Sequence, residues 1–165
     1  MSTVVGIFAD QNSAERAVNE VQKAGVSEDE ISIIAREDSM QNDGEQAGQN
    51  LEGQRNQGQD LTNGAATGGT LGGLAGLLAG AGALTIPGVG PILAAGPIAA
   101  GLTGAAAGGL AGSMVDMGID QEEGQRYEQE VQQGSILAVV EADQGEEEDI
   151  ASYFKRSGAQ EVKTH

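Results

Sequence analysis

The chain has 165 residues, no cysteine and a formal net charge of −17. This length fits one domain, or one small domain carrying an insertion. Without cysteine, disulfides and thiolate metal sites are excluded, and a reducing compartment is expected. The acidic charge argues against nucleic acid and anionic lipid headgroups as electrostatic partners.

Charged residues are distributed very unevenly along the chain. Residues 1–60 hold 12 acidic and 4 basic side chains, and residues 116–165 hold 13 acidic and 4 basic ones. None of the residues between Asp60 and Asp116 is charged. The first residues lack the basic and long apolar segments of a secretory signal, so a cytoplasmic N-terminus is expected. Two acidic arms therefore flank an uncharged middle.

The first arm has the pattern of a β-α-β unit. Residues 3–9 (TVVGIFA) are apolar and β-branched, as in a buried strand. Asn12 and Glu15 have the spacing of a capping box, apolar residues follow at helical spacing, and Gly25 stands where a helix ends. Residues 30–36 (EISIIAR) then predict a second strand.

The second arm repeats this plan. Residues 135–142 (SILAVVEA) predict a strand, and the acidic run 146–149 precedes a helix that ends with Lys155, Arg156 and Gly158. A short strand follows. The segments 9–11 and 142–144 both read Ala-Asp-Gln, so the two arms align with an offset of 133 residues. One additional helix, at about 120–133, is expected before this arm.

Two β-α-β units predict an α+β fold, a ferredoxin-like sheet of four antiparallel strands with helices on one face. We expect the first β-α-β half at 1–37 and a flexible Gln/Asn/Gly-rich linker at 38–63. An inserted glycine-zipper helix hairpin is expected at 64–118, and a helix plus the second β-α-β half at 119–165.

The uncharged middle carries small residues at every fourth position, in two copies. Glycine costs about 1 kcal/mol relative to alanine inside a helix, so such a ridge needs a closely packed neighbour. We expect helices at about 65–84 and 97–116, joined by a turn at Pro87, Gly88, Gly90 and Pro91. The helix-packing ridge comprises Gly64, Gly68, Gly72, Gly76 and Gly80, then Gly96, Ala100, Gly104, Gly108 and Gly112.

One such hairpin cannot cover its own apolar surface, so it needs lipid, further copies of itself, or the sheet. Helices of about 20 uncharged residues favour a membrane hairpin. Their moderate hydrophobicity, and the lack of aromatic or basic residues at the boundaries, favour a soluble assembly. A flexible linker is the remaining structural interpretation. In the membrane arrangement, Gly88 and Ser157 would lie on opposite sides.

No set of residues suggests catalysis, a cofactor or a metal site. The only histidine is His165, at the end of the sequence, where fraying is expected. The acidic run 146–149 lacks the spacing of a calcium loop and fits the start of a helix better. Arg36 and Arg126 could be buried ion-pair partners, but the surface is favoured. The chain is therefore expected not to be an enzyme.

The order of motifs resembles the bacterial general stress protein family, which includes the low-temperature-induced proteins of cyanobacteria. The resemblance rests on residues 6–38, on IPGVGPI at 86–92 and on residues 117–143. It implies a stress-induced, non-enzymatic bacterial protein, in a family often expected to associate with membranes. No functional residue can be transferred from it.

Taken together, these patterns predict a stress-response protein whose glycine-zipper hairpin drives self-association at or in the cytoplasmic membrane, with both termini cytoplasmic. The alternative is a soluble cytoplasmic homo-oligomer with the hairpins as its core. A regulatory module that binds a small ligand is a third possibility, which rests on fold analogy alone. The expected partner is the chain itself, with a lipid bilayer as a second candidate and nucleic acid excluded.

Overall fold

A computed structural model describes residues 2–40, 74, 81–86, 89–104 and 109–165. Six antiparallel strands form one sheet in the order β3-β4-β2-β5-β1-β6. The strands are β1 (Ser2–Phe8), β2 (Ile31–Arg36), β3 (Gly82–Ile86), β4 (Gly90–Ala95), β5 (Ile136–Ala142) and β6 (Glu161–Thr164). The helices are α1 (Gln11–Lys23), η1 (Glu28–Glu30), α5 (Pro97–Gly104), α6 (Gly109–Val115), α7 (Gln121–Gln132) and α8 (Glu147–Ser157).

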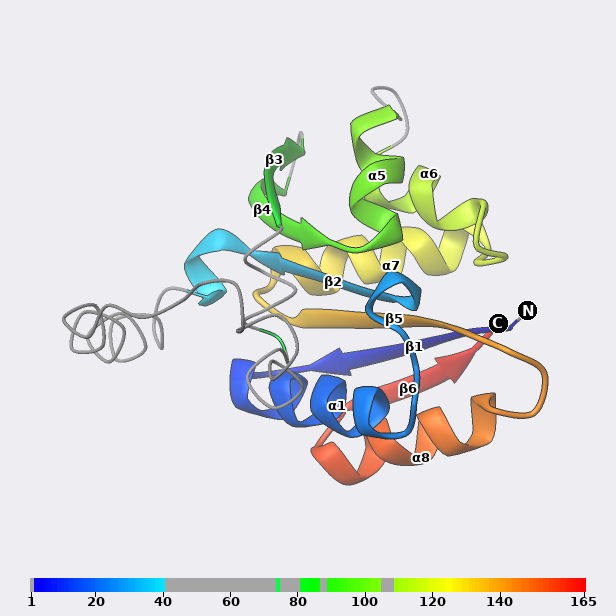
Figure 1. Cartoon of the computed structure of the whole chain (residues 1–165). Helices are drawn as coiled ribbons and strands as arrows, with labels where there is room; N and C mark the ends of the chain where they lie inside the picture. The colour runs from blue at the N-terminus through cyan, green and yellow to red at the C-terminus, as the bar shows by residue number, and fades with distance from the viewer. Residues whose placement is uncertain (1, 41–73, 75–80, 87–88, 105–108) are drawn as a thin grey trace, which may run out of the picture.

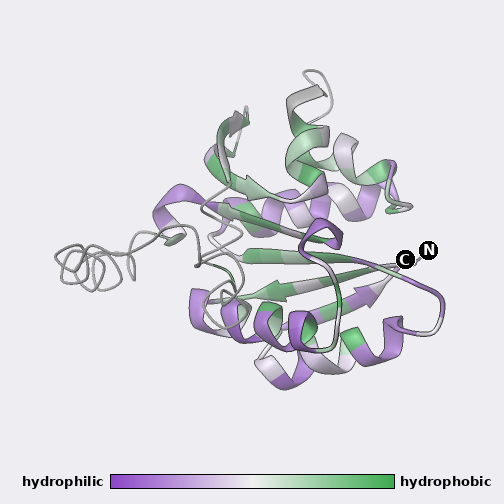
Figure 2. Cartoon of the chain, viewed as in Figure 1, coloured by the Kyte–Doolittle hydropathy of each residue, from purple (hydrophilic) through white to green (hydrophobic). Residues whose placement is uncertain are grey.

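Helices cover both faces of the sheet (Figure 1). Helices α1 and α8 pack on one face, around Val4, Ile33 and Phe154. Helices α5, α6 and α7 pack on the other face, around Val139 and Tyr127. Alternate residues of the central strands enter the two clusters, as the period of a strand requires. Figure 2 shows hydrophobic central strands, with mostly hydrophilic residues in α1, α7 and α8 and paler to hydrophobic ones in α5 and α6.

The two arms form the centre of this sheet, in the order β2-β5-β1-β6. Their strands and helices lie where the sequence pattern predicts them, within about two residues. The start of α1 differs in detail. The cap is Asp10, not Asn12, and its carboxylate accepts hydrogen bonds from the backbone N–H and the hydroxyl of Ser13, each at 2.9 Å. The Ser13 backbone N–H is the main reason why the pKa of Asp10 is lowered.

Close packing between the arms explains one glycine in β1. A Cβ added at Gly6 would lie 2.5 Å from Cδ2 of Phe154, the side chain through which α8 packs on the sheet. Phe154 also meets Phe8 edge to face, with the ring centroids 5.6 Å apart. Gly6 therefore leaves the space that this aromatic pair occupies.

The uncharged middle differs most from the sequence expectation. Residues 82–86 and 90–95 were expected as the end of a helix and its turn, but they form a β-hairpin that extends the sheet beside β2. Of the expected first helix, residues 65–73 and 75–80 lie outside the described residues, and Leu74 is fully buried in the cluster below α1 and α8. The physical reason is that β2 is apolar and would otherwise be an open edge, so pairing with it outweighs local helix preference.

The expected second helix, 97–116, is also incorrect as one continuous element. It comprises two helices, α5 and α6, and Gly109, the first residue of α6, has a φ of +61°, which lies outside the right-handed helical region and marks the break. Both pieces pack back on the sheet through Ile98, Leu110 and Met114.

Candidate self-association surface

The second copy of the glycine ridge contains one close backbone approach, at Gly96. This residue has a φ of +84° and follows β4 directly. A Cβ added there would collide with the carbonyl oxygen of Ile31 and would lie 2.8 Å from the Cα of Ser32. The Ser32 hydroxyl accepts a hydrogen bond from the backbone N–H of Ile98 at 3.2 Å, which fixes the start of α5 on β2. The close approach at Gly96 is therefore to a strand, whereas the sequence pattern predicted approach to another helix.

The other members of that copy that the structure describes, Ala100, Gly104 and Gly112, do not form a shared contact row. Ala100 is exposed, Gly112 has open space around its added Cβ, and Gly104 ends α5. Instead, α5 approaches α6 at Gly101, whose added Cβ would lie 3.5 Å from the Cβ of Ser113. Gly108, like the first copy at Gly64, Gly68, Gly72, Gly76 and Gly80, lies outside the described residues.

Among the helix glycines that the structure describes, the one closest to a neighbouring helix lies outside the ridge, at Gly124 of α7. A Cβ added there would lie 2.9 Å from the Cα of Ala111 in α6. No close contact at Gly124 was expected from the sequence. The available signal was a single glycine within an otherwise regular amphipathic helix, where its cost in helix propensity requires a compensating contact.

The segment predicted as a turn between two helices instead connects the two strands β3 and β4. Pro87 and Gly88 lie outside the described residues, Gly90 has a φ of +93°, and Pro91 is part of β4 opposite Thr85. Strand β4 pairs with β2, so 82–86 and 90–95 belong to the same sheet as the arms. This corrects the expected topology of two spans, because the arms and the hairpin cannot share one sheet across a membrane. In the described portion of the chain, no helix combines the length and the apolar character that a membrane span requires.

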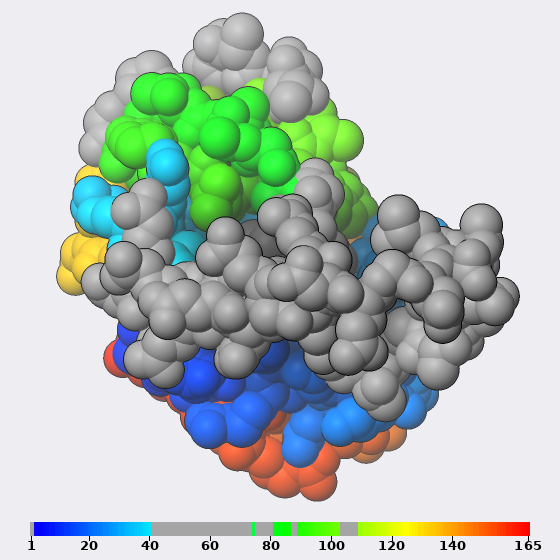
Figure 3. Space-filling model, turned by 60° about the vertical axis from the view of Figure 1, so that its left-hand side comes forward, coloured from blue at the N-terminus to red at the C-terminus, as the bar shows by residue number. Residues whose placement is uncertain are grey.

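Strand β3 is one end of the sheet, and the residues of this strand carry no charge. Gly82, Ala83 and Thr85 are exposed, while Leu84 is half-buried and Ile86 is buried in the cluster beside α5 to α7. Figure 3 shows the insertion, in green, gathered at one end of the molecule, away from the blue and red arms. Proteins usually protect such an edge with charges or prolines. This edge can therefore accept another strand.

Strand β6, at the opposite end, is protected by charges. Glu161 and Lys163 of this strand, and His165 directly after it, each contact a residue of α7. Arg126 binds Glu161 through two hydrogen bonds of 2.6 and 3.1 Å, and Nζ of Lys163 lies 2.6 Å from the Glu123 carboxylate. These donors lower the pKa of both carboxyls, Arg126 acting on Glu161 and Lys163 acting on Glu123. The charged side chains of β6 are therefore held in ion pairs with α7 along this edge of the sheet.

His165, which was expected to be frayed, is held in place by contacts with Tyr127 and Thr3. Its Nε2 lies 2.9 Å from the hydroxyl oxygen of Tyr127, and its backbone exchanges two hydrogen bonds with Thr3. Burial, with the negative charge of Glu123 as the second cause, raises the pKa of Tyr127 to about 12. The hydroxyl is therefore neutral and can donate to the imidazole. Arg126 is a half-exposed ion-pair partner, and Arg36 is likewise paired, with Asp38 at 2.7 Å.

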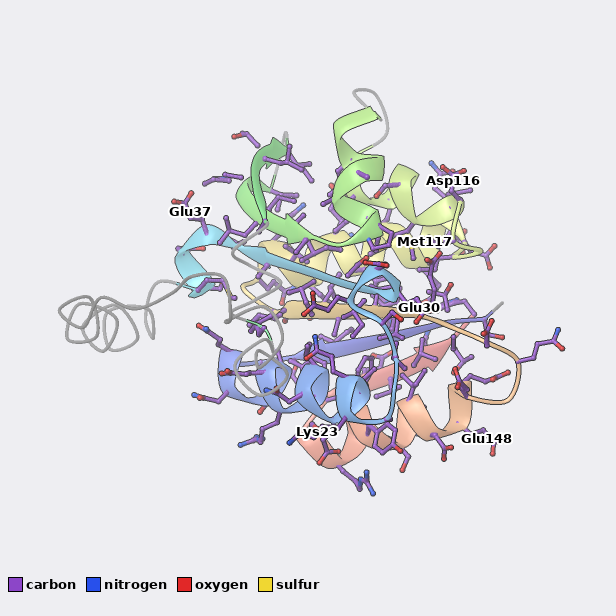
Figure 4. The ribbon with its side chains drawn as sticks, in the orientation of Figure 1. Lys23, Glu30, Glu37, Asp116, Met117 and Glu148 are labelled. Carbon is purple, nitrogen blue, oxygen red and sulfur yellow. The ribbon has the colours of Figure 1, made fainter. Side chains whose placement is uncertain are left out.

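Other charged groups of the described residues have structural partners or lie in solvent. The acidic run begins α8, where Glu147 accepts a hydrogen bond of 2.6 Å from the backbone N–H of Gly145. Figure 4 shows Lys23, Asp116 and Glu148 at the periphery of the molecule. Within the part of the chain that the structure describes, no three His, Asp or Glu side chains form a group that could hold a metal ion.

No family model, curated protein or solved structure matches this chain. The function is therefore inferred from the geometry of the molecule. Of the surfaces described, the uncharged edge at β3 has the most direct chemical consequence, since among the described strands β3 pairs with β4 alone.

Proposed function

We propose that this chain is a non-enzymatic stress-response protein that acts by associating with copies of itself, and that the insertion formed by β3, β4, α5 and α6 provides the contact. The observation that carries the proposal is the uncharged, exposed edge strand β3 in an otherwise acidic molecule. An open edge of this kind is a template for another strand.

The charge layout supports contact through the insertion. Each copy carries a net charge of −17, and all of its charged residues lie within 1–60 and 116–165. Two copies repel each other wherever their arms meet, whereas residues 61–115 contribute no charge to that repulsion. Association is therefore least unfavourable when the copies meet at the insertion.

The structure of the arms also supports a division of roles, in which the arms form a folded unit and the insertion mediates assembly. Their strand order, β2-β5-β1-β6, with α1 and α8 on one face, fits a ferredoxin-like unit made from two β-α-β halves. We assign the arms to this fold and the insertion to assembly. The stress-response role comes from the resemblance to general stress proteins, and it predicts that the abundance of the protein rises after cold or salt shock.

The test is the oligomeric state of the full-length protein, measured by native mass spectrometry and light scattering at several protein and salt concentrations. We expect oligomers whose population rises between about 20 and 500 mM salt, because salt screens the repulsion between acidic arms. A protein that remains monomeric at every protein and salt concentration would overturn the proposal. Arm-to-arm ion pairing would instead give oligomers that dissociate as salt is added.

A further inference from the structure

The backbone of β3 has a defined outward side. The carbonyl of Ile86 accepts a hydrogen bond from the backbone N–H of Val89 at 3.1 Å, so it faces the β4 side. The N–H and C=O of one strand residue point to the same side, and successive residues alternate. Leu84 therefore also faces β4, while the N–H and C=O groups of Ala83 and Thr85 face away from it.

Pro91 supports this assignment independently. It lies opposite Thr85 in the pairing of β3 with β4. Proline has no N–H, so it fits a position where the two facing residues exchange no hydrogen bonds. Thr85 then directs its own N–H and C=O outward, as the turn geometry also requires.

We propose that two copies pair antiparallel along β3, with a two-fold axis passing beside Leu84. This inference rests on the proposed self-association and names its contact. Ala83 of one copy lies opposite Thr85 of the second, and the reverse pair is equivalent by symmetry. Each pair exchanges two hydrogen bonds, so four bonds form, and the two six-stranded sheets become one continuous sheet.

The side chains suit this register. Leu84 lies on the face covered by α5 to α7 and packs against the cluster there. At the two-fold axis it meets Leu84 of the second copy in a pair without hydrogen bonds, the type in which side chains lie closest. Ala83 and Thr85 are small and exposed on the other face, so they do not obstruct the approach.

The distribution of charge favours pairing of two copies through β3 over pairing through β6, the strand at the opposite edge of the sheet. Strand β3 and its partner β4 carry no charged residue. Strand β6 carries Glu161 and Lys163, both already paired with α7. Pairing two copies through β6 would require those ion pairs to be rearranged, whereas pairing through β3 disturbs none.

The register can be tested by single cysteines, because the chain has none of its own. In Leu84→Cys, the two sulfur-bearing residues would face each other with Cα atoms about 4.5 Å apart, within the range that a disulfide spans. In the matched control Thr85→Cys, the two positions lie diagonally, about 7–8 Å apart, beyond that range. We expect mild oxidation of the full-length protein to give a covalent dimer with Leu84→Cys and none with Thr85→Cys, on a non-reducing gel.

A second variant tests the hydrogen bonds. Thr85→Pro removes an outward N–H that β4 does not use, and proline is accepted at such an edge. It would remove two of the four bonds of the pair, so we expect the dimer dissociation constant to rise about tenfold or more. Thr85→Ser keeps the N–H and should leave it unchanged. Circular dichroism checks that each variant is folded.

The outcomes separate this inference from the proposed function. Oligomers that persist in Thr85→Pro, together with no disulfide in Leu84→Cys, would overturn pairing through β3 and leave self-association standing. Equal disulfide yields from the two cysteine variants would also overturn it, because no single register places both positions face to face. A monomeric parent protein would overturn both proposals.

Discussion

Gly96→Ala is the most direct test of how the insertion is built. Two separate costs arise at this residue. Its φ of +84° lies in the left-handed region, which costs a residue with a Cβ about 1–2 kcal/mol. The added Cβ would also meet backbone atoms of Ile31 and Ser32, which cannot move without disturbing β2. Overpacking of this kind typically costs about 1–3 kcal/mol.

The expected loss in the free energy of unfolding is therefore roughly 2–5 kcal/mol. Two control substitutions separate the contributions. Gly90→Ala has a φ of +93° but no atom within 4 Å of the added Cβ, so only the conformational cost of about 1–2 kcal/mol remains. Gly112→Ala lies in α6 with open space around it, and it should gain up to about 1 kcal/mol of helix propensity.

Urea unfolding followed by circular dichroism would give the three free energies, provided that the dependence on urea concentration is the same in each variant. Gly96 and Gly112 have equivalent positions in the four-residue repeat, so a glycine ridge predicts the same sign for both. The structure predicts opposite signs. Equal effects at Gly96 and Gly90 would refute close approach to β2, and a destabilising Gly112→Ala would favour the ridge.

Three further predictions concern α7 and the β6 edge. Gly124→Ala should destabilise the protein by about 1–3 kcal/mol in urea unfolding despite its better helix propensity, because the added methyl meets the α6 backbone; a neutral result would contradict the close packing. His165→Ala should cost about 1–3 kcal/mol, since it removes the imidazole that lies 2.9 Å from the Tyr127 hydroxyl, and should cost little in a Tyr127→Phe background. Arg126 lowers the pKa of Glu161, so the stabilisation from this ion pair is full above the ordinary carboxyl value of 4.5 and is lost as the pH falls through the lowered pKa. The stability difference between the parent protein and Glu161→Gln, from unfolding curves at pH 2–7, should therefore be constant above about pH 4.5 and shrink below it; a difference that persists in acid would contradict this account.

The arms could be predicted because their signals are local and occur twice. Apolar, β-branched runs, an acidic start to α8 and Gly158 with a φ of +103° at its end each have a direct counterpart in the structure. The β6 edge carried a signal too. Glu161, Lys163 and His165 recur at the period of a strand, and α7 carries matching residues at helical spacing.

The insertion could not be predicted in the same way because its pattern is ambiguous. A short apolar run rich in alanine and glycine fits a buried helix or a strand, and periodicity alone does not distinguish them. The deciding contact is between residues 92–95 and β2, about 60 positions apart in the chain. The regular glycine spacing favoured helices, while Ile86, Ile92 and the nearby prolines were the signals for a strand pair.

Comparison of the two repeated arms explains why an insertion is placed here at all. Strands β2 and β6 are equivalent in the repeat, and both would be edges of the arm sheet. Strand β6 contains two charged residues and remains an edge, whereas Ile31–Ala35 of β2 are fully buried and need a covering strand. The insertion supplies β4 as that cover, which moves the open edge outward to β3. Because the new edge carries no charge, covering one strand has created the surface through which we propose that two copies meet.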